Sequence, residues 1–352
     1  MTNGIMAAYG LSDPNAAYAR DYHEGCTAGR ILSQEKGIYR LISEKGEQFA
    51  EISGKLRYHA KRAADFPAVG DFVVADCNSF QGNAVIHEIL PRKSVFIRKA
   101  AGTGNTEQVV AANIDTVFIC MSLNRDFNLR RLERYFAVAW ESGASPVIVL
   151  TKSDLCSDPE AFISRVEQIA FGTDILLTSA MEQDGCKKLL PYIPFGCTAA
   201  LIGSSGVGKS TLINQLLRED RMETRGLRND DKGKHTTTRR ELFLLEQGGM
   251  VIDTPGMREL GLWDTGEGLE QSFSDIKALA AMCRFRDCSH TDEPHCAVQE
   301  AIAKGELSKE RFQSYQKLKT ENRYTEDTEG YLAEKKQKFK NIAKANKSFR
   351  RR

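Results

Sequence analysis

The sequence predicts a multidomain α/β protein with an all-β N-terminal part and an α-helical C-terminal part. Short segments of alternating polar and apolar residues, separated by glycines, fill residues 29–97. Longer apolar runs then alternate with helical stretches from about residue 105 to residue 262. After Gly268 the pattern is helical and contains three of the nine cysteines. These patterns are typical of a small β-barrel, a doubly wound α/β domain and a helical module that binds a metal.

The composition is that of an ordinary globular protein, with 41% hydrophobic and 27% charged residues in 352. Apolar stretches such as Asp115–Leu123 are the length of a strand and are much shorter than the ~20 residues that cross a bilayer. The first 25 residues show no basic start followed by an apolar run, so no signal peptide is predicted. We expect a cytoplasmic monomer without membrane contact. The odd number of cysteines argues against a disulfide framework.

The net charge of +2 is unevenly distributed along the chain. Residues 331–352 contain nine Lys or Arg and one Glu, a charge of +8, so residues 1–330 carry −6. A basic tail on a mildly acidic body indicates an anionic partner such as a nucleic acid. The alternative is a charged helix that only contacts solvent.

Four short segments in the N-terminal part have the alternation expected of strands. They are Ile38–Ile42, Gln48–Ile52, Asp71–Ala75 and Ala84–Leu90. Several short strands within ~70 residues predict an OB-type (oligonucleotide-binding) β-barrel over residues 29–100. An SH3-like or unclassified barrel is the alternative. Residues 1–28 show no sustained periodicity, and we expect a loosely held extension there.

The middle part alternates apolar strands with helices, as a doubly wound parallel sheet requires, and we place this domain at residues 105–265. The expected strands are Thr116–Met121, Pro146–Leu150, Asp174–Leu177, Cys197–Ile202 and Met250–Asp253. The expected helices are Leu129–Glu141, Pro159–Phe171 and Lys209–Leu217. The helical C-terminal domain then covers residues 266–352.

A phosphate-binding loop of the form G-x-x-x-x-G-K-[ST] spans Gly203–Ser210, between an expected strand and an expected helix. Its glycines let backbone N–H groups face phosphate oxygens, and the helix N-terminus adds its dipole. Lys209 would contact the β- and γ-phosphates as a catalytic group, while the Ser210 hydroxyl would coordinate Mg²⁺. The nucleotide contacts expected in this segment are Gly203, Ser204, Ser205, Gly206, Val207, Gly208, Lys209, Ser210 and Thr211.

A second loop, Thr151–Asp154, has the form that reads guanine. The Asp154 carboxylate can accept hydrogen bonds from N1–H and the 2-amino group of guanine, which adenine cannot supply. Asn is usual where Thr151 stands, so we expect this loop to be somewhat looser. A further short loop follows the next strand and is expected to back the base. The nucleotide contacts expected from both loops are Thr151, Lys152, Asp154, Ser179 and Ala180.

The order of these two loops along the chain is unusual. The base-reading loop precedes the phosphate loop, whereas an ordinary GTPase has the phosphate loop first. The sequence therefore predicts a circularly permuted Ras-like P-loop GTPase domain. Three or four residues alone would indicate only an ordinary αβ loop, and it is the order of the motifs that supports the assignment.

Asp253-Thr-Pro-Gly256 ends the last expected strand and has the form of a γ-phosphate switch. Asp253 would hold Mg²⁺, and the Gly256 N–H would bond the γ-phosphate. A polar segment before this motif ends in Thr236, Thr237 and Thr238, among which the sequence does not choose. We expect Thr237 to complete the Mg²⁺ shell.

Met257 stands where a glutamine usually orients the attacking water. Because methionine cannot bond that water, we expect slow intrinsic hydrolysis and assign a catalytic role to His235, brought to the water by a partner. The alternative for His235 is an ordinary surface histidine.

The C-terminal cysteines have the spacing C-x4-C-x-H-x5-C, formed by Cys283, Cys288, His290 and Cys296. Three thiolates and one imidazole satisfy tetrahedral Zn²⁺, and a complete set of protein ligands indicates one structural zinc ion. His295 is a competing ligand, and a reduced, metal-free cluster is the alternative. A catalytic zinc is disfavoured because no ligand position is open.

Together these motifs resemble the RsgA/YjeQ family of small-subunit-dependent GTPases over about residues 29–350. The matching segments are Val69–Val73, Leu90–Ser94, Ala112–Asp115, Thr151–Asp154, Gly203–Ser210, Gly233–Thr238, Asp253–Gly256 and the cysteine cluster. The resemblance implies an OB domain, a permuted GTPase and a zinc domain that act in late maturation of the 30S ribosomal subunit. It also implies binding of GTP, GDP and 16S rRNA, with hydrolysis of GTP stimulated by the subunit. Thr151 and the extension at residues 1–28 depart from the family pattern.

Two other functions stay open on the sequence. One is an RNA-binding module whose nucleotide is a static ligand, which measurable multiple-turnover hydrolysis would exclude. The other is a metabolic or signalling P-loop NTPase that uses ATP. Competition between GTP and ATP, and salt-dependent binding to 30S particles, would separate that function from the first.

Overall fold

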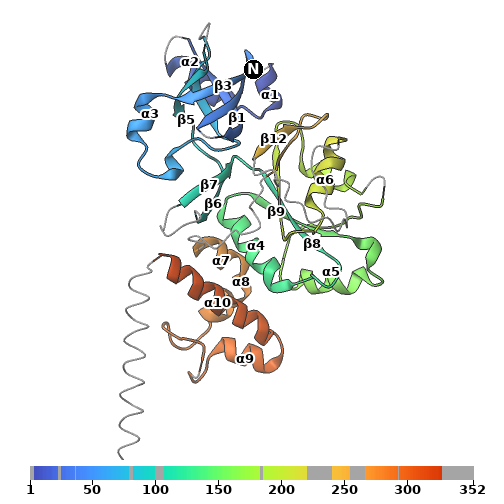
Figure 1. The fold of residues 1–352 in the computed structure, drawn as a ribbon. Coiled ribbons are helices and arrows are strands. Elements are labelled where there is room, and N and C mark those ends of the chain that lie inside the picture. The colour runs from blue at the N-terminus through green and yellow to red at the C-terminus, as the bar shows by residue number, and fades with distance from the viewer. Residues whose placement is uncertain are drawn as a thin grey trace, which may run out of the picture. The chain divides into compact units, whose positions relative to one another are not determined.

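The computed structural model describes residues 4–22, 25–35, 37–78, 82–99, 107–182, 185–219, 240–253, 266–291 and 293–326. It divides into two compact units, residues 1–261 and residues 262–352 (Figure 1). The barrel and the GTPase sheet both belong to the first unit. The predicted domain boundaries within that unit remain predictions. Among the described helices, none combines the length and the apolar character that crossing a bilayer requires.

Five strands of the first unit form a closed barrel (Figure 1, blue). They are β1 (Cys26–Glu35), β2 (Ile38–Ser43), β3 (Gly46–Ile52), β4 (Phe72–Asp76) and β5 (Ala84–Ile89). Their order is β1-β2-β3-β5-β4, and β1 also pairs with β4, which closes the ring. β3 and β5 are parallel, and α3 (Gly54–His59) lies between β3 and β4 along the chain. This is an OB-like barrel, as predicted, and its interior is filled by a cluster that includes Tyr39, Leu41, Val73 and Ile86.

The sequence pattern does not predict β1, because two of its polar residues are buried. Arg30 and Ser33 are each 1% exposed, which breaks the usual alternation of buried apolar and exposed polar residues. A β-bulge between Ile31 and Ser33 disturbs the alternation further. The hairpin of β6 (Val95–Lys99) and β7 (Glu107–Ala112), which follows the barrel, is also absent from the predictions.

The N-terminal segment is packed against the rest of its unit, and the expectation of a loosely held extension is wrong for residues 4–22. The segment contains α1 (Ile5–Ala8) and α2 (Asp13–Tyr22). Met6 and Ala19 are completely buried, and Leu11 is nearly so. The helices are short and their buried residues are few, so no periodicity is visible in the sequence.

The GTPase part is a sheet of order β10-β9-β8-β11-β13-β12 (Figure 1, teal to orange). Its strands are β8 (Thr116–Ser122), β9 (Ser145–Thr151), β10 (Ile175–Leu177), β11 (Thr198–Ile202), β12 (Glu241–Leu244) and β13 (Met250–Asp253). Each is parallel to its neighbours except β12, which is antiparallel to β13. All five predicted strands are present, whereas β12 is too short to be recognised from its sequence.

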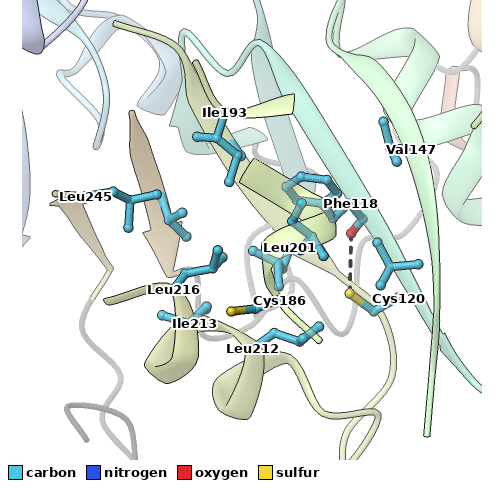
Figure 2. Packing of buried hydrophobic residues seen from close by; sticks show 14 of the residues in the cluster. Phe118, Cys120, Val147, Cys186, Ile193, Leu201, Leu212, Ile213, Leu216 and Leu245 are labelled. Carbon is cyan, nitrogen blue, oxygen red and sulfur yellow. Dashed lines mark hydrogen bonds between the residues drawn. The ribbon is translucent and has the colours of Figure 1, made fainter. Parts of the chain in front are cut away.

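The helices of this part are α4 (Leu129–Glu141), α5 (Pro159–Glu167) and α6 (Lys209–Leu217). Two of them match the predicted bounds, and α5 ends before the predicted Phe171, which is exposed. Figure 2 shows how α6 is fixed: Leu212, Ile213 and Leu216 pack with Phe118 of β8 and Leu201 of β11 in one buried cluster. Because α6 cannot shift without disrupting this cluster, the loop that precedes it is held in place.

The barrel and the GTPase part share one sheet of 11 strands, because β1 also pairs with β12. Arg30 of β1 is buried at this junction, with its guanidinium over the Phe72 ring. Its N–H groups donate to Tyr9 O, Gly70 O, Asn113 O, Thr198 Oγ1 and Met250 Sδ, at 2.6–3.2 Å. The N-terminal segment, the barrel and two strands of the GTPase part are thereby joined by one side chain. Burial lowers the pKa of Arg30 to about 10, so the group is charged at neutral pH.

Three of the segments that carry the family resemblance meet beside Arg30. They are Val69–Val73, Leu90–Ser94 and Ala112–Asp115. Arg92 makes a two-pronged ion pair with the buried Asp71, both contacts at 2.7 Å. The Asn113 side chain donates to Gly70 O at 3.1 Å and accepts from Lys93 N at 3.1 Å. Gly70 has a φ of +90°, and a Cβ there would lie 2.2 Å from the Ala112 carbonyl, so only glycine fits. These motifs therefore build the junction rather than the nucleotide site.

The second unit is helical, as predicted, with α7 (Gly266–Ser272), α8 (Ser274–Ala281), α9 (Ala297–Lys304) and α10 (Lys309–Glu326). The Arg311 guanidinium lies over the Phe273 ring and makes two 2.7 Å contacts with Asp275. This ion pair joins α10 to α8. The basic segment 331–352 lies outside the described residues.

Candidate GTP and zinc sites

The phosphate loop connects β11 to α6, as the sequence predicts. Gly203 has a φ of +146°, and a Cβ there would lie 2.4 Å from the Cys120 carbonyl on the neighbouring strand β8. Gly208 precedes the first residue of α6 and has a φ of +105°. Side chains are therefore disfavoured at both ends of the loop, which leaves its backbone N–H groups accessible to a phosphate.

The Lys209 ammonium lies on the phosphate loop itself. Its Nζ donates to the carbonyl oxygens of Gly203 and Ser204, both at 2.6 Å. Cys120 lies nearby, and burial raises the pKa of its thiol to about 12, although the Lys209 charge acts in the opposite direction. The thiol is therefore neutral, and it does not compensate the charge that Lys209 can offer to a phosphate.

The base-reading loop is bonded directly to the phosphate loop. The Thr151 hydroxyl, which is buried at the end of β9, donates to the Val207 carbonyl at 2.6 Å. Threonine therefore supplies a direct link between the two loops, although asparagine is usual at this position. Lys152 then adopts a left-handed conformation with a φ of +58°, which turns the chain towards Asp154.

The Asp154 carboxylate is held by the loop that follows β10. The Ser179 hydroxyl donates to Asp154 Oδ1 at 2.5 Å and accepts from the Met181 N–H at 3.1 Å. Gln215 of α6 donates to the Ala180 carbonyl at 3.1 Å. Residues from three separate segments are thus gathered at one edge of the sheet, where the sequence predicts the base to bind.

Asp253 ends β13 at the same edge. β13 is parallel to β11, so Asp253, at its carboxyl end, lies on the side of the sheet where the phosphate loop follows β11. The Asp253 carboxylate and the Ser210 hydroxyl are hard oxygen donors of the kind that Mg²⁺ prefers, so the donor set fits this ion. The other predicted switch groups, Thr237, His235 and Gly256, lie outside the described residues and remain predictions.

The predicted zinc ligands lie together in the second unit. The ligand atoms of Cys283, Cys288, His290 and Cys296 are all within 4.8 Å of one another. His290 Nδ1 is 3.5 Å from the sulfurs of Cys283 and Cys296, which are 3.9 Å apart. Zn–S and Zn–N bonds of about 2.3 and 2.0 Å in a tetrahedron give edges of about 3.5 Å (S to N) and 3.8 Å (S to S). The four groups therefore fit a zinc ion, and the exposed His295 is not part of the cluster.

A carboxylate that the sequence analysis does not single out supports this cluster. Glu293 accepts hydrogen bonds from the Ser289 hydroxyl and from the N–H groups of Ser289 and Thr291. These hydrogen bonds lower the pKa of Glu293 to about 2, and the bond from the Ser289 side chain has the largest effect. Gln299 of α9 donates to the His290 carbonyl at 2.6 Å. The loop that carries His290 is thereby fixed from two sides.

The fold and these loops define a circularly permuted P-loop GTPase. The strand that carries the guanine-reading loop, β9, precedes the strand that carries the phosphate loop, β11, yet both lie in one parallel sheet.

Comparison with known proteins agrees with this class. A family model described as RsgA GTPase matches residues 89–263. The small ribosomal subunit biogenesis GTPase RsgA 2 of Lactiplantibacillus plantarum is 50% identical over 301 residues, which cover 85% of this chain and 84% of the relative. The small ribosomal subunit biogenesis GTPase RsgA of Methanosarcina acetivorans is 46% identical over 295 residues, covering 84% of this chain and 79% of the relative.

Two solved structures are similar over most of the chain. YjeQ from Thermotoga maritima has a TM-score of 0.63 at 27% identity and covers 83% of this chain and 97% of its own. YloQ, described as a circularly permuted GTPase, has a TM-score of 0.62 at 26% identity and covers 85% of this chain and 96% of its own. The chain belongs to the RsgA GTPase family and is a GTP hydrolase.

Proposed function

We propose that this chain hydrolyses GTP to GDP and phosphate during late maturation of the 30S ribosomal subunit, and that the subunit stimulates the reaction. The proposal includes binding to 16S rRNA and action as a monomer in the cytoplasm, where these subunits mature. The names of the relatives support the role in small-subunit biogenesis. The hydrogen bond from Thr151 to Val207 carries the nucleotide part, because it joins the guanine-reading loop to the phosphate loop.

In this proposal each loop has one task. Asp154 accepts hydrogen bonds from guanine, while Ser179 fixes its carboxylate. The backbone of residues 203–208 and the Lys209 ammonium bind the phosphates, and Asp253 and Ser210 would hold Mg²⁺. When bound with the nucleotide, Mg²⁺ would neutralise charge on the β- and γ-phosphates. His235 then acts on the attacking water, and Thr237 and Gly256 complete the γ-phosphate contacts.

A basic segment with an exposed aromatic ring supports the RNA part. Tyr58 of α3 is 85% exposed. Exposed basic residues surround it in the sequence: Lys55, Arg57, His59, Lys61 and Arg62. An exposed ring can stack on an unpaired base, and cationic side chains bind the phosphate backbone. We therefore assign residues 55–62 to contact with rRNA.

The zinc loop has a similar composition in the second unit. Arg284, Phe285 and Arg286 are exposed between the ligands Cys283 and Cys288, with the Arg284 guanidinium near the Phe285 ring. A structural zinc ion held by the four ligands would present this loop in a fixed conformation. The basic segment 331–352 is assigned to the same task, which is contact with the phosphate backbone.

The decisive experiment is GTP hydrolysis by the full chain with and without purified 30S subunits. We expect multiple turnovers, a marked increase in rate with the subunits, and no competition from ATP. An unchanged rate with 30S subunits would contradict the proposed partner, and competition by ATP would indicate the metabolic or signalling NTPase instead.

The RNA surface has its own test in the salt dependence of binding to 30S subunits. Each phosphate contact that is lost reduces the slope of log affinity against log salt by about 1. Arg57→Gln combined with Lys61→Gln should therefore lower the slope by about 2. Arg218→Gln in the GTPase part is the matched control, and equal slopes for all variants would contradict the assignment of α3.

A further inference from the structure

The hydroxyl of Thr178 is a buried polar group without a hydrogen bond. Thr178 directly follows β10 and is 1% exposed. Among the residues that the structure describes, none is in hydrogen-bonding position to its Oγ1. Its backbone, in contrast, is bonded on both sides: the N–H donates to Leu150 O at 2.9 Å, and the carbonyl accepts from Ser153 N at 3.2 Å. Buried polar groups are nearly always paired, so this hydroxyl calls for an explanation.

Thr178 is the neighbour of Thr151 in the sheet. β10 and β9 are parallel, and Leu177 of β10 is paired with Leu150 of β9. The residues that directly follow this pair are Thr178 and Thr151. The two backbone bonds of Thr178 go to the residue before Thr151 and to the second residue after it, which keeps the two threonines side by side.

Both side chains point to the face of the sheet that α6 covers. Val149, two positions before Thr151, belongs to the buried cluster that fixes α6. Leu176, two positions before Thr178, packs against the same cluster. Side chains two positions apart on a strand point to the same face. Thr151 and Thr178 therefore share this face, at the end of the strands where the phosphate loop lies.

Thr151 uses its hydroxyl for the phosphate loop. The Oγ1 donates to Val207 O at 2.6 Å, with a longer contact to Met121 O at 3.4 Å. A hydroxyl has a single proton to donate, and here the proton is directed away from β10. The oxygen is attached to Cβ, so the side chain is short. Thr151 therefore connects β9 to the phosphate loop and makes no bond to Thr178.

An asparagine side chain in the same place could bond to both groups at once. Its amide has two N–H donors and a carbonyl acceptor, all one bond further from the backbone than the threonine hydroxyl. The Nδ2 group would donate to Val207 O, while Oδ1 would accept from the Thr178 hydroxyl. The buried hydroxyl is thus the partner that a longer residue at position 151 would use.

We propose that residue 151 determines how firmly this chain holds guanine nucleotides, because threonine leaves the Thr178 hydroxyl unused. Thr178 directly precedes Ser179, whose hydroxyl holds the Asp154 carboxylate. The segment that orients Asp154 therefore has one anchor fewer than the fold allows. The consequence is faster release of GDP and weaker discrimination at the base than the same chain would have with asparagine. The inference rests on the proposed reading of guanine by Asp154.

The test is a double-mutant cycle on residues 151 and 178 of the full chain, with the release rate of a fluorescent GDP analogue as the measurement. Thr151→Asn should slow release about fivefold, which corresponds to one net hydrogen bond. Thr178→Val should change the rate by less than about twofold, because no bond is lost. In the Thr151→Asn background, Thr178→Val should remove the whole gain, because the amide oxygen then loses its donor.

Thr116→Val is the matched control for Thr178→Val. Thr116 is also buried, at 8% exposed, but its hydroxyl donates to Tyr192 O at 2.9 Å. Urea unfolding should therefore give a lower stability for Thr116→Val, and an equal or higher stability for Thr178→Val. A loss of stability in Thr178→Val as large as that of the control would show that the Thr178 hydroxyl is paired, and would overturn the inference.

Inosine diphosphate (IDP) separates better base reading from a general gain in rigidity. IDP lacks the 2-amino group that Asp154 is proposed to read. Since a bond to Thr178 would order the segment that orients Asp154, the ratio of GDP affinity to IDP affinity should rise about threefold in Thr151→Asn. In the double variant the ratio should return to that of the parent.

The outcomes distinguish this inference from the proposed function. Release that Thr151→Asn does not slow, slowing that persists when Thr178→Val is added, or a GDP to IDP ratio that stays constant overturns the role of residue 151 alone. Equal affinity of the parent for GDP and IDP overturns the proposed reading of guanine by Asp154, and the inference with it.

Discussion

The hydroxyl of Thr151 is a buried donor with an acceptor on another loop, and this makes its replacement informative. Thr151→Val keeps the shape of the side chain but leaves the Val207 carbonyl without its partner. An unsatisfied buried acceptor costs about 1–3 kcal/mol, so we expect lower stability and weaker GDP binding. Urea unfolding and nucleotide titration measure both. Thr151→Ser retains a hydroxyl, so its stability and its affinity for GDP should stay close to those of the parent. Equal stability and equal affinity in the valine and serine variants would contradict the role of this bond.

Asp154 offers a test of base recognition that does not depend on the rate of hydrolysis. Asp154→Asn replaces one acceptor oxygen by an amide donor, which matches the 2-oxo group of xanthine and not the 2-amino group of guanine. We expect the affinity for GDP to fall by at least about 100-fold, since an unmatched polar group in the site is costly. The affinity for xanthosine diphosphate (XDP) should then be higher than the affinity for GDP. Glu160→Gln, an exposed change of the same kind in α5, is the control. Unchanged preference for GDP would show that Asp154 does not read the base.

Cys120 provides a prediction from its pKa. Burial raises the pKa of this thiol to about 12, and thiolate is the form that alkylating reagents attack. At about pH 8, iodoacetamide should therefore label the partly exposed Cys156 well before Cys120, as peptide mass spectrometry would reveal. Labelling of Cys120 at the rate of Cys156 in the folded protein would contradict the buried position of Cys120 beneath the phosphate loop.

At the scale of elements, the cluster of three cysteines and His290, which fits a zinc ion, joins α9 to the loop that follows α8. Metal binding and folding are linked in such small modules, so removal of zinc should destabilise the second unit. We expect Cys296→Ser to lose the bound zinc and to lower the temperature at which the second unit unfolds, measured by metal analysis and thermal unfolding. His295→Ala should retain one zinc ion per chain, because His295 is not part of the cluster. Loss of zinc in the His295 variant and retention in the Cys296 variant would reverse the ligand assignment.

The elements that the sequence predicts are those with a local pattern. The parallel strands of the GTPase sheet are continuous apolar runs because both of their faces are buried. β1 lacks such a pattern, since it buries Ser33 and also Arg30, whose hydrogen-bond partners come from distant parts of the chain. The packing of residues 4–22 is missed because its two helices are short and bury few residues, so no periodicity is visible. Burial of a polar residue can be explained only when its partners are known.

The same distinction applies to the candidate site. The phosphate loop, Asp154 and the zinc ligands are recognisable because each chemistry requires given residue types at fixed spacing. The bond from Thr151 to Val207 joins residues 56 positions apart, and the pair of Arg40 with Glu241 joins residues 201 positions apart. No spacing rule extends over such separations. Interactions that connect motifs to one another therefore become visible only in the folded chain.

At the scale of the whole molecule, the pairing of β1 with β12 joins the barrel to the GTPase strands in a single continuous sheet. A barrel that was only tethered could move freely, as domains with small interfaces do. Here three sets of contacts cross the junction or brace it. They are the hydrogen bonds of the buried Arg30, the ion pair of Arg40 with Glu241, and the contacts of Asn113. We therefore expect the first unit to unfold as one cooperative body, with the N-terminal segment included.

Arg30→Met tests this cooperativity. Methionine retains much of the volume but removes every donor, so the acceptors at Tyr9, Gly70, Asn113 and Thr198 lose their hydrogen bonds from Arg30 together. Gly70 O then keeps its bond from Asn113. A buried acceptor that is left without its donor costs about 1–3 kcal/mol, so we expect a marked loss of stability. Because the acceptors lie in the N-terminal segment, the barrel and the GTPase part, hydrogen exchange should become faster in β2, β3, β8 and β11 to a similar degree. If exchange rose in the barrel strands alone while β8 and β11 kept the protection of the parent, the two parts would be unfolding separately, and the continuous sheet would not be a cooperative one.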